Sequence, residues 1–245
     1  MTATAPGPRR EDRLDYYVRW RNLSGPYFAW QVEQFRPFLG QRIADVGCGP
    51  GTMTPLLATS RELYLGVDLD PRLLDALQHA YRDVPSIQVF AGDITTEACR
   101  DRLLAERVDT IVCANLIEHI DDDALALRRM TEALPVGRYL CLLVPAFPAL
   151  YGTFDAIDGH YRRYTKAMLR GRLRPLPLAI RRLYYFNSIG AIGWLVKARL
   201  LKEQHHREEN FHLMNLVTRV VRPVERLVHP PFGISLIAIL QRRAA

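Results

Sequence analysis

The residues with the clearest chemical meaning lie at positions 43–51. The sequence there is Ile-Ala-Asp-Val-Gly-Cys-Gly-Pro-Gly, in which an apolar run meets Asp45 and then three glycines at alternate positions, Gly47, Gly49 and Gly51. Glycine permits backbone angles and close approaches that other residues exclude, so the pattern indicates a buried strand that ends in a ligand-binding loop. An ordinary glycine-rich turn would carry the same residues, so the pattern gains meaning from the residues that come after it.

The spacing of the glycines separates two classes of nucleotide cofactor. A dinucleotide-binding loop has the pattern G-x-G-x-x-G/A, which here requires Gly or Ala at position 52. Thr52 occupies that position, so the NAD pattern fails at one of its fixed points. The pattern present is [Asp/Glu]-x-G-x-G-x-G.

Acidic residues also end the next two predicted strands. Asp68 follows the apolar run 63–67, where a carboxylate can accept hydrogen bonds from both hydroxyls of a ribose. Asp93 ends the run 87–92, although a helix-capping carboxylate would look the same there. Acids at three successive strand ends favour a site for a nucleoside.

Two histidines are candidate catalytic bases, and either could instead hold its loop in place. His119 ends the run Asn115-Leu-Ile-Glu-His, directly after a predicted fourth strand. His160 begins the run His-Tyr-Arg-Arg-Tyr, in a long segment rich in proline and aromatic residues. Long ordered loops in compact domains are usually functional, and His160 is the preferred base. Candidate acceptor-binding residues in this segment are Tyr151, Tyr161, Arg163 and Tyr164.

The elements that must position these residues alternate between strand and helix. Such alternation is typical of α/β proteins, in which ligands bind at the carboxyl ends of parallel strands. A helix over 52–58 would direct its free N–H groups at a cofactor carboxylate. Asp70 would cap the next helix. The first predicted strand ends near position 46. The other six cover 63–68, 87–94, 108–114, 139–144, 181–187 and 234–240.

The glycine loop and the Asn-x-x-Glu-His-Ile element together resemble the class I S-adenosylmethionine-dependent methyltransferases, in particular the small-molecule domains of the ubiquinone and menaquinone biosynthesis type. The resemblance covers residues 40–190 and resumes at the last strand. It implies a Rossmann-like, seven-stranded, mostly parallel sheet with an antiparallel last strand and helices on both faces. It also implies S-adenosylmethionine as the cofactor.

The resemblance further implies which residues bind this cofactor. The glycine loop would pass under the methionine part, Asp68 would bind the ribose, and Asp93 the adenine amino group. Tyr17 would reach the methionine carboxylate from an N-terminal segment that folds over the cofactor. The full set of implied cofactor-binding residues is Tyr17, Asp45, Gly47, Cys48, Gly49, Gly51, Asp68, Leu69, Asp93, Ile94 and Asn115.

The resemblance also bears on the methyl acceptor. Enzymes that methylate base amines or glutamine amides carry [Asn/Asp]-Pro-Pro-[Tyr/Phe] after the fourth strand, and cytosine C5 enzymes carry Pro-Cys; neither is present. This disfavours nucleic acid as a partner. We expect O-methylation of a small molecule, such as a secondary metabolite, sugar or lipid-linked compound. The alternative is a protein that binds the cofactor but performs cyclisation, or binds a partner, without methyl transfer.

The chain is predicted to have one main domain with added segments. Residues 1–10 resemble a loose, disordered tail without the apolar core of a signal peptide. Residues 11–39 form an aromatic-rich helical lid, most of whose aromatics pack on the core. Residues 40–245 form the methyltransferase domain, with acceptor-cap insertions at about 145–170 and 189–232.

Cysteine usage and charge complete the expectations. The four cysteines show no C-x-x-C pairing, which favours free thiols in a reducing cytoplasm and no metal site; His205 and His206 are expected in a solvated turn. Residues 160–245 hold 17 Lys and Arg against 4 Asp and Glu, whereas residues 1–159 hold 16 against 22. With the amphipathic helix predicted from Leu213, this leaves open a peripheral membrane contact, a pocket lid or a homodimer surface.

Overall fold

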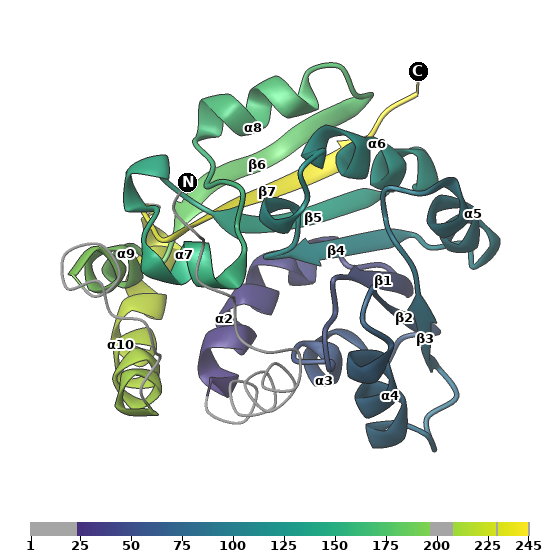
Figure 1. The fold of residues 1–245 in the computed structure, drawn as a ribbon, viewed down its shortest axis with the longest axis horizontal. Coiled ribbons are helices and arrows are strands. Elements are labelled where there is room, and N and C mark those ends of the chain that lie inside the picture. Colours follow the sequence, from purple (N-terminus) through teal and green to yellow (C-terminus); the bar gives the residue numbers. More distant parts are fainter. Residues whose placement is uncertain (1–23, 197–207, 229, 245) are drawn as a thin grey trace, which may run out of the picture.

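The structure, a computed structural model, describes residues 24–196, 208–228 and 230–244. Its strands form one seven-stranded sheet in the order β3-β2-β1-β4-β5-β7-β6 (Figure 1). Strands β1 to β5 pair in parallel, whereas β7 pairs antiparallel with both β5 and β6. This confirms the predicted Rossmann-like sheet with an antiparallel last strand. The strands are β1 Arg42–Val46, β2 Leu63–Asp68, β3 Ile87–Ala91, β4 Thr110–Ala114, β5 Tyr139–Pro145, β6 Leu178–Phe186 and β7 Ser235–Arg242.

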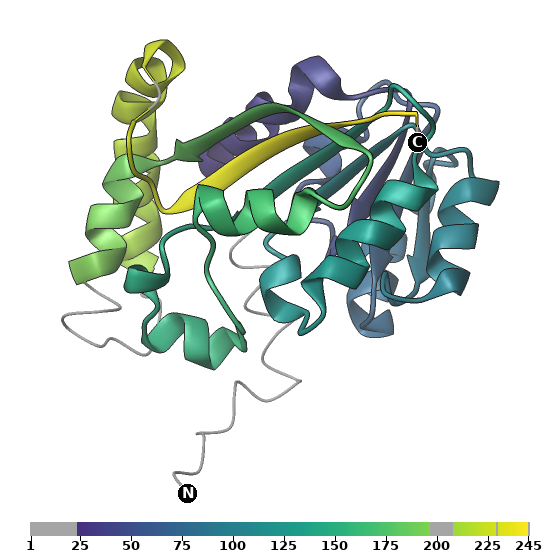
Figure 2. The same ribbon diagram turned by 90° about the horizontal axis from the view of Figure 1, so that it is seen from above.

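Helices cover both faces of the sheet (Figures 1 and 2). Helices α5, α6 and α8 bury their apolar side chains on one face, and α2, α3, α4 and α10 on the other. Among the described residues, none of these helices combines the length and apolar character needed to span a bilayer. The helices are α2 Gly25–Phe35, α3 Thr54–Leu57, α4 Pro71–Ala80, α5 Glu97–Ala105, α6 Asp123–Ala133, α7 Thr153–Asp158, α8 Lys166–Leu173, α9 Ser188–Trp194 and α10 Glu208–Leu227, with short 3-10 turns η1 Arg36–Phe38, η2 Ile117–His119 and η3 Pro148–Leu150.

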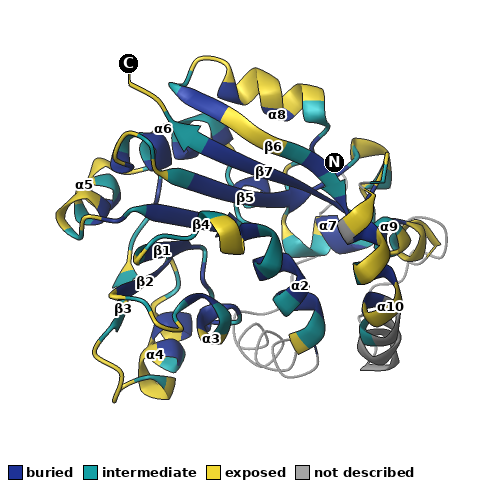
Figure 3. Cartoon of the chain, turned by 180° about the vertical axis from the view of Figure 1, so that it is seen from behind, coloured by how far each residue is buried: buried dark blue, intermediate teal, exposed yellow. Residues whose placement is uncertain are grey.

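The central strands are apolar because both of their faces are covered. In β1, Ala44 and Val46 join the core under α5 and α6, while Ile43 joins the core under α2. Figure 3 shows the central strands as buried and the outer sides of α5 and α8 as exposed. Parallel strands that are buried on both faces read as continuous apolar runs, which is why they could be located in the sequence.

Helix α2 is part of this core. The indole of Trp30 is 1% exposed and its ring centroid lies 4.2 Å from that of Phe186 in β6. Glu33 forms an ion pair with Arg222 of α10, with 2.8 Å between Oε2 and Nε. The described part of the 11–39 segment thus packs on the sheet, whereas Tyr17 and residues 1–10 lie outside the described residues.

Several predicted element boundaries were wrong: β3, for example, ends at Ala91 and not at Ile94. Two of the differences have a clear physical reason. The helix expected over 52–58 is the single turn α3, because the N–H of Thr54 is still bonded to Gly51 and Ser60 adopts a positive φ of 58° beyond its end. One turn has little macrodipole, so the proposed anion site at its N-terminus is not supported. Strand β6 begins at Leu178 instead of Arg181, and a bulge between Ile180 and Arg182 interrupts the alternation by which a strand is recognised.

The two predicted cap insertions meet at the carboxyl edge of the parallel strands. Trp194 of α9 donates from Nε1 to the carbonyl of Leu150, at 3.1 Å, and its ring lies 5.2 Å from that of Phe154. The buried carboxylate of Glu225 in α10 accepts hydrogen bonds from the backbone N–H groups of Asn187 and Ser188, at 2.9 and 2.7 Å. The start of α9 is therefore fixed to α10, and its last residue is fixed to the segment after β5.

Candidate active site

The glycine loop after β1 has the backbone that its sequence predicts. Gly47, Gly49 and Gly51 have positive φ values of 81°, 55° and 82°, a region that disfavours residues with a Cβ. A Cβ on Gly47 would lie 2.9 Å from the side chain of Leu116, whereas a Cβ on Gly49 would meet nothing within 4 Å. The loop therefore packs tightly at Gly47 and faces open space at Gly49.

Asp45 lies beneath this loop in a chain of buried hydrogen bonds. The hydroxyl of Tyr64 donates to its carboxylate at 2.8 Å, and the hydroxyl of Thr54 donates to Tyr64 at 2.8 Å. Burial raises the pKa of Asp45 to about 7; the bond from Tyr64 opposes this shift and the charge of Asp68 adds to it. Asp45 is 4% exposed, so the structure places it as a support of the loop.

Asp68 is oriented by the loop and by its own turn. Its Oδ2 accepts from the N–H of Gly49 at 2.9 Å, and its Oδ1 accepts from the N–H of Asp70 at 3.0 Å. Each carboxylate oxygen keeps acceptor capacity for a further donor. Leu69 comes next in the chain with 67% of its surface exposed, which is unusual for a leucine and suits the flat face of a base.

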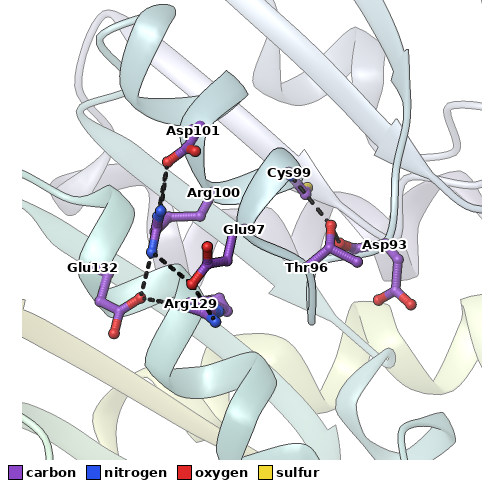
Figure 4. Close-up of polar contacts among 8 residues, drawn as sticks. All are labelled: Asp93, Thr96, Glu97, Cys99, Arg100, Asp101, Arg129 and Glu132. Carbon is purple, nitrogen blue, oxygen red and sulfur yellow. Dashed lines mark hydrogen bonds and ion pairs between the residues drawn. The ribbon is translucent and has the colours of Figure 1, made fainter.

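Asp93 lies where β3 leads into α5 (Figure 4). Its Oδ1 accepts from both the N–H and the hydroxyl of Thr95, at 2.8 and 2.7 Å, while Thr96 is the residue that caps α5. Ile94 is 3% exposed and its side chain belongs to the main core. The helix α5 is fixed to α6 by an ion-pair network formed by Glu97, Arg100, Arg129 and Glu132.

Cys48 and Asn115 occupy opposite environments. Cys48 is buried with its thiol pointing at its own loop, and burial raises its pKa, so it offers a ligand its backbone only. Asn115 is exposed at the end of β4 and has a positive φ of 52°. The thiols of all four cysteines are free, as predicted, and buried.

The residues at this edge fit the cofactor that the resemblance implies. The backbone is open above Gly49, the carboxylate of Asp68 lies beside it, and an exposed apolar surface comes next at Leu69. These features would receive, in that order, the methionine part, the ribose and the adenine of S-adenosylmethionine. The individual contacts remain predictions.

The second group of candidate residues centres on the buried carboxylate of Asp155 in α7. Its Oδ1 accepts from Nε of Arg163 at 2.8 Å and lies 2.7 Å from Nδ1 of His160, and its Oδ2 accepts from the N–H of Gly152 at 2.9 Å. Burial would raise the pKa of Asp155, but the bond from His160 and the charge of Arg163 outweigh it and lower the pKa. Asp155 was not singled out from the sequence, although it lies in the same long segment as His160, five residues before it.

The turn η2 joins this group to the glycine loop. Leu116, just before η2, packs against Gly47, and the carbonyl of Glu118 accepts from the N–H of Tyr161 at 2.8 Å. The rings of His119 and His160 lie edge to face with 4.5 Å between centroids. Both candidate bases therefore lie in one cluster, which sequence separation alone could not show.

Glu118 completes the cluster. One ligand atom from each of Glu118, His119 and His160 lies within 4.8 Å of the others, an arrangement that could hold a metal ion. The expectation of no metal site rested on cysteine spacing, which carries no information about this group. His205 and His206 lie outside the described residues.

The four residues expected to bind the acceptor separate into two pairs. Tyr151 and Tyr161 are 36% and 59% exposed. Arg163 and Tyr164 are 2% and 0% exposed, so their burial gives no support to the predicted acceptor-binding role, which stays a prediction for them. The guanidinium of Arg163 is held by Asp155 and lies 4.6 Å from the ring of Trp194, and the hydroxyl of Tyr164 donates to Asp123 of α6 at 2.9 Å.

Comparison with known proteins agrees with this geometry. Residues 43–137 match the family described as a methyltransferase domain. In sequence, the chain is similar to the ubiquinone biosynthesis O-methyltransferase of Azorhizobium caulinodans, with 34% identity over 113 residues that cover 46% of this chain and 43% of the relative. In structure, it is similar to a SAM-dependent methyltransferase from Archaeoglobus fulgidus, with a TM-score of 0.61 and 16% identity over 93% of this chain and 99% of that one. It is also similar to the [4+2]-cyclase SpnF, with a TM-score of 0.54 and 14% identity over 84% and 76% of the two chains.

The sheet order, the glycine loop and the acidic strand ends define a Rossmann-like methyltransferase fold. Residues 43–137 thus form a methyltransferase domain, and the fold agrees with the class I S-adenosylmethionine-dependent methyltransferases that the sequence resembles. The match spans less than half the length of the sequence relatives, 43% and 48% for the two from Azorhizobium caulinodans and Coxiella burnetii. The likeness to the solved structures shows the fold.

The raised pKa of Asp45 predicts a pH-dependent stability. The folded protein keeps a proton on Asp45 up to a pH of about 7, whereas an unfolded aspartate releases it near pH 3.9. Stability should therefore fall as pH rises through this window, by up to about 1.4 kcal/mol per pH unit. Asp45→Asn removes this dependence and still accepts the bond from Tyr64. Urea unfolding of both proteins should be measured at pH 4.5, 6 and 7.5. The free energy of unfolding of the variant should rise relative to that of the wild type as pH increases. A difference in free energy that is the same at all three pH values would contradict the prediction.

Proposed function

We propose that the protein transfers a methyl group from S-adenosylmethionine to a hydroxyl of a small-molecule acceptor. The observation that carries the proposal is the Asp155–His160 pair, at 2.7 Å, in the same cluster as the turn that packs on the glycine loop. The pair supplies a base at the edge where the cofactor is expected. The name of the Azorhizobium caulinodans relative, an O-methyltransferase, supports oxygen as the methylated atom.

The geometry also supports a tautomer of His160. A carboxylate with a lowered pKa, such as Asp155, is ionised and accepts hydrogen bonds only, so Nδ1 of His160 must carry the proton between them. In the neutral imidazole, Nε2 is then unprotonated and can take the proton of an acceptor hydroxyl. The bound cofactor would supply an electrophilic methyl group on its sulfonium. Tyr151 donates to the carbonyl of His160 at 2.8 Å and helps to fix the base.

The alternative function is cyclisation or partner binding without methyl transfer. The same fold occurs in the [4+2]-cyclase SpnF, so fold similarity alone does not choose between them. Methyl transfer and the alternative both require cofactor binding. They differ in whether the cofactor loses its methyl group. Formation of the demethylated cofactor in step with a methylated product supports methyl transfer, whereas an acceptor converted with the cofactor intact supports the alternative.

The cofactor site gives a direct binding prediction. S-adenosylmethionine and its demethylated product should bind in isothermal titration calorimetry, and NADH should not, because the glycine spacing departs from the dinucleotide pattern. Asp68→Ala should weaken binding by about 1.5–3 kcal/mol, the scale of hydrogen bonds to a charged group. The exposed neighbour variant Arg72→Ala is the matched control and should bind normally. Normal affinity in a folded Asp68→Ala protein would remove Asp68 from the site.

The proposed base gives a kinetic prediction. His160→Ala should lower turnover by about 10²–10⁴ and leave cofactor affinity unchanged, because it removes proton abstraction and not cofactor contacts. His119→Ala is the matched comparison, since its ring lies 4.5 Å from that of His160. Near-normal turnover of His160→Ala, with a large loss in His119→Ala, would assign the base to His119.

We also infer that the cap formed by α9 and α10 contacts the surface of a membrane with anionic lipids. Apolar side chains project from these helices into solvent: Ile192 is 53% exposed, Val220 65%, Val224 62% and Leu227 87%. Arg219 is exposed between them, and the C-terminal third of the chain is strongly basic. Apolar and basic groups together are typical of helices that lie on a membrane.

Sedimentation with vesicles tests this contact. Binding should favour anionic over neutral vesicles and weaken as salt rises, because basic groups are attracted within a Debye length of the surface. Val224→Glu should reduce binding, whereas Val136→Glu, on the far side of the fold between α6 and β5, should not. If the protein stays in the supernatant with both vesicle types at low salt, the surface is instead a pocket lid or a contact between two copies, and light scattering separates these two.

A further inference from the structure

Glu118 is a buried acid that the proposed mechanism has not used. It lies in η2, its side chain is 0% exposed, and neither carboxylate oxygen has a hydrogen-bond partner among the described residues. Leaving a charged group in this state is costly, so a buried acid without partners is rare unless it has a further role.

The position of Glu118 points to His160. A carboxylate oxygen of Glu118 and a ring nitrogen of His160 lie within 4.8 Å of each other. Charged and titratable groups face Glu118 from each element packed against it: Cys113 of β4, His119 of its own turn, and Asp155, His160, Arg163 and Tyr164 from the segment after β5.

The charges around His160 do not balance once its ring is protonated. Asp155 and Arg163 form an ion pair at 2.8 Å, and their opposite charges cancel. When His160 takes a proton, the imidazolium adds a positive charge whose nearest carboxylate is already paired. Glu118 is the second carboxylate within reach. Its negative charge would balance the imidazolium, so that the four side chains of Asp155, Arg163, His160 and Glu118 have no net charge.

We propose that Glu118 is the counter-ion of His160: its carboxylate stabilises the imidazolium that forms when His160 accepts the proton of the acceptor hydroxyl. Glu118 is thus a positioning residue that acts through His160, and the inference rests on the proposed function. In the reaction, the acceptor O–H bond breaks and its proton goes to His160. The bound cofactor would supply the methyl group, its methyl–sulfur bond breaking as the O–CH₃ bond forms, and the proton would leave His160 for solvent after product release.

The electrostatics agree with this role. Burial lowers the pKa of His160, but the bond to Asp155 and the charge of Glu118 outweigh it and raise the pKa. Burial raises the pKa of Glu118 to about 7, against the opposing charge of His160. Glu118 can therefore change its charge near neutral pH, and the raised pKa of His160 agrees with a negative charge beside its ring.

The test is an NMR titration of the His160 ring in the whole protein, which needs neither acceptor nor turnover. Glu118→Gln keeps the shape of the side chain and removes its charge, so the pKa of His160 should fall by about one unit or more. Glu118→Asp should retain most of the wild-type pKa. Glu132→Gln, which removes a carboxylate from the distant α5–α6 network, is the matched control and should leave His160 unchanged.

Turnover supplies a second readout. The acidic limb of the pH profile of kcat/KM should move to lower pH in Glu118→Gln by the same shift, a change that a merely structural residue would not produce. If His160 shifts but no methyl transfer occurs, the ion pair stands and the proposed function fails. If the His160 titration is the same in wild type and in folded Glu118→Gln, the proposal is overturned.

A metal ion is the competing explanation for the same cluster. Adding Mn²⁺ to the protein tests it, because a paramagnetic ion bound there would broaden the ring signals of His119 and His160. No site-specific broadening is expected. Broadening in the wild type that disappears in Glu118→Gln would make Glu118 a metal ligand and would overturn the proposal.

Discussion

The carboxylate of Asp155 is the contact on which the proposed acceptor side of this protein depends. One oxygen meets Arg163 and His160 at 2.8 and 2.7 Å, and the other accepts from Gly152 at 2.9 Å. These bonds close a segment that would otherwise be a long loop of prolines and aromatics after β5. Removing one partner of such a buried pair leaves the other charge uncompensated, so the segment is held as a unit. The imidazole that it presents is oriented by the same oxygen that binds the arginine.

The turn η2 connects this unit to the cofactor side. Leu116 packs on Gly47, which has no side chain, and the carbonyl of Glu118 receives the N–H of Tyr161. A four-residue stretch after β4 thereby fixes the glycine loop relative to the proposed base. Alignment of cofactor and base is what a displacement reaction demands most, because a bound near-attack geometry supplies a large share of its acceleration.

Three buried carboxyl groups in this region behave differently for a physical reason. Asp45 has one neutral donor and Glu118 has none among the described residues, and burial raises the pKa of each to about 7. Asp155 is as deeply buried, but a cation, an imidazole and a backbone N–H lower its pKa. The contrast arises from the partners and not from depth. Asp155 is therefore a permanent anion that orients the proposed base, whereas Asp45 and Glu118 can exchange a proton near neutral pH.

The sequence by itself determined the parallel strands, the glycine loop and the acids at the strand ends. Strands buried on both faces appear as apolar runs, and the residues after them must share one edge of the sheet. It also located His119 and His160, because their residue types and neighbours are distinctive. The tertiary structure alone decided which side of the segment after β5 faces inward. The run Arg163-Tyr164 has no periodicity that distinguishes a buried face, so only folding shows that Asp155 and Asp123 hold these side chains in the interior. The role proposed for Glu118 was equally hidden, since a lack of hydrogen-bond partners is a property of three-dimensional surroundings and leaves no mark on the chain.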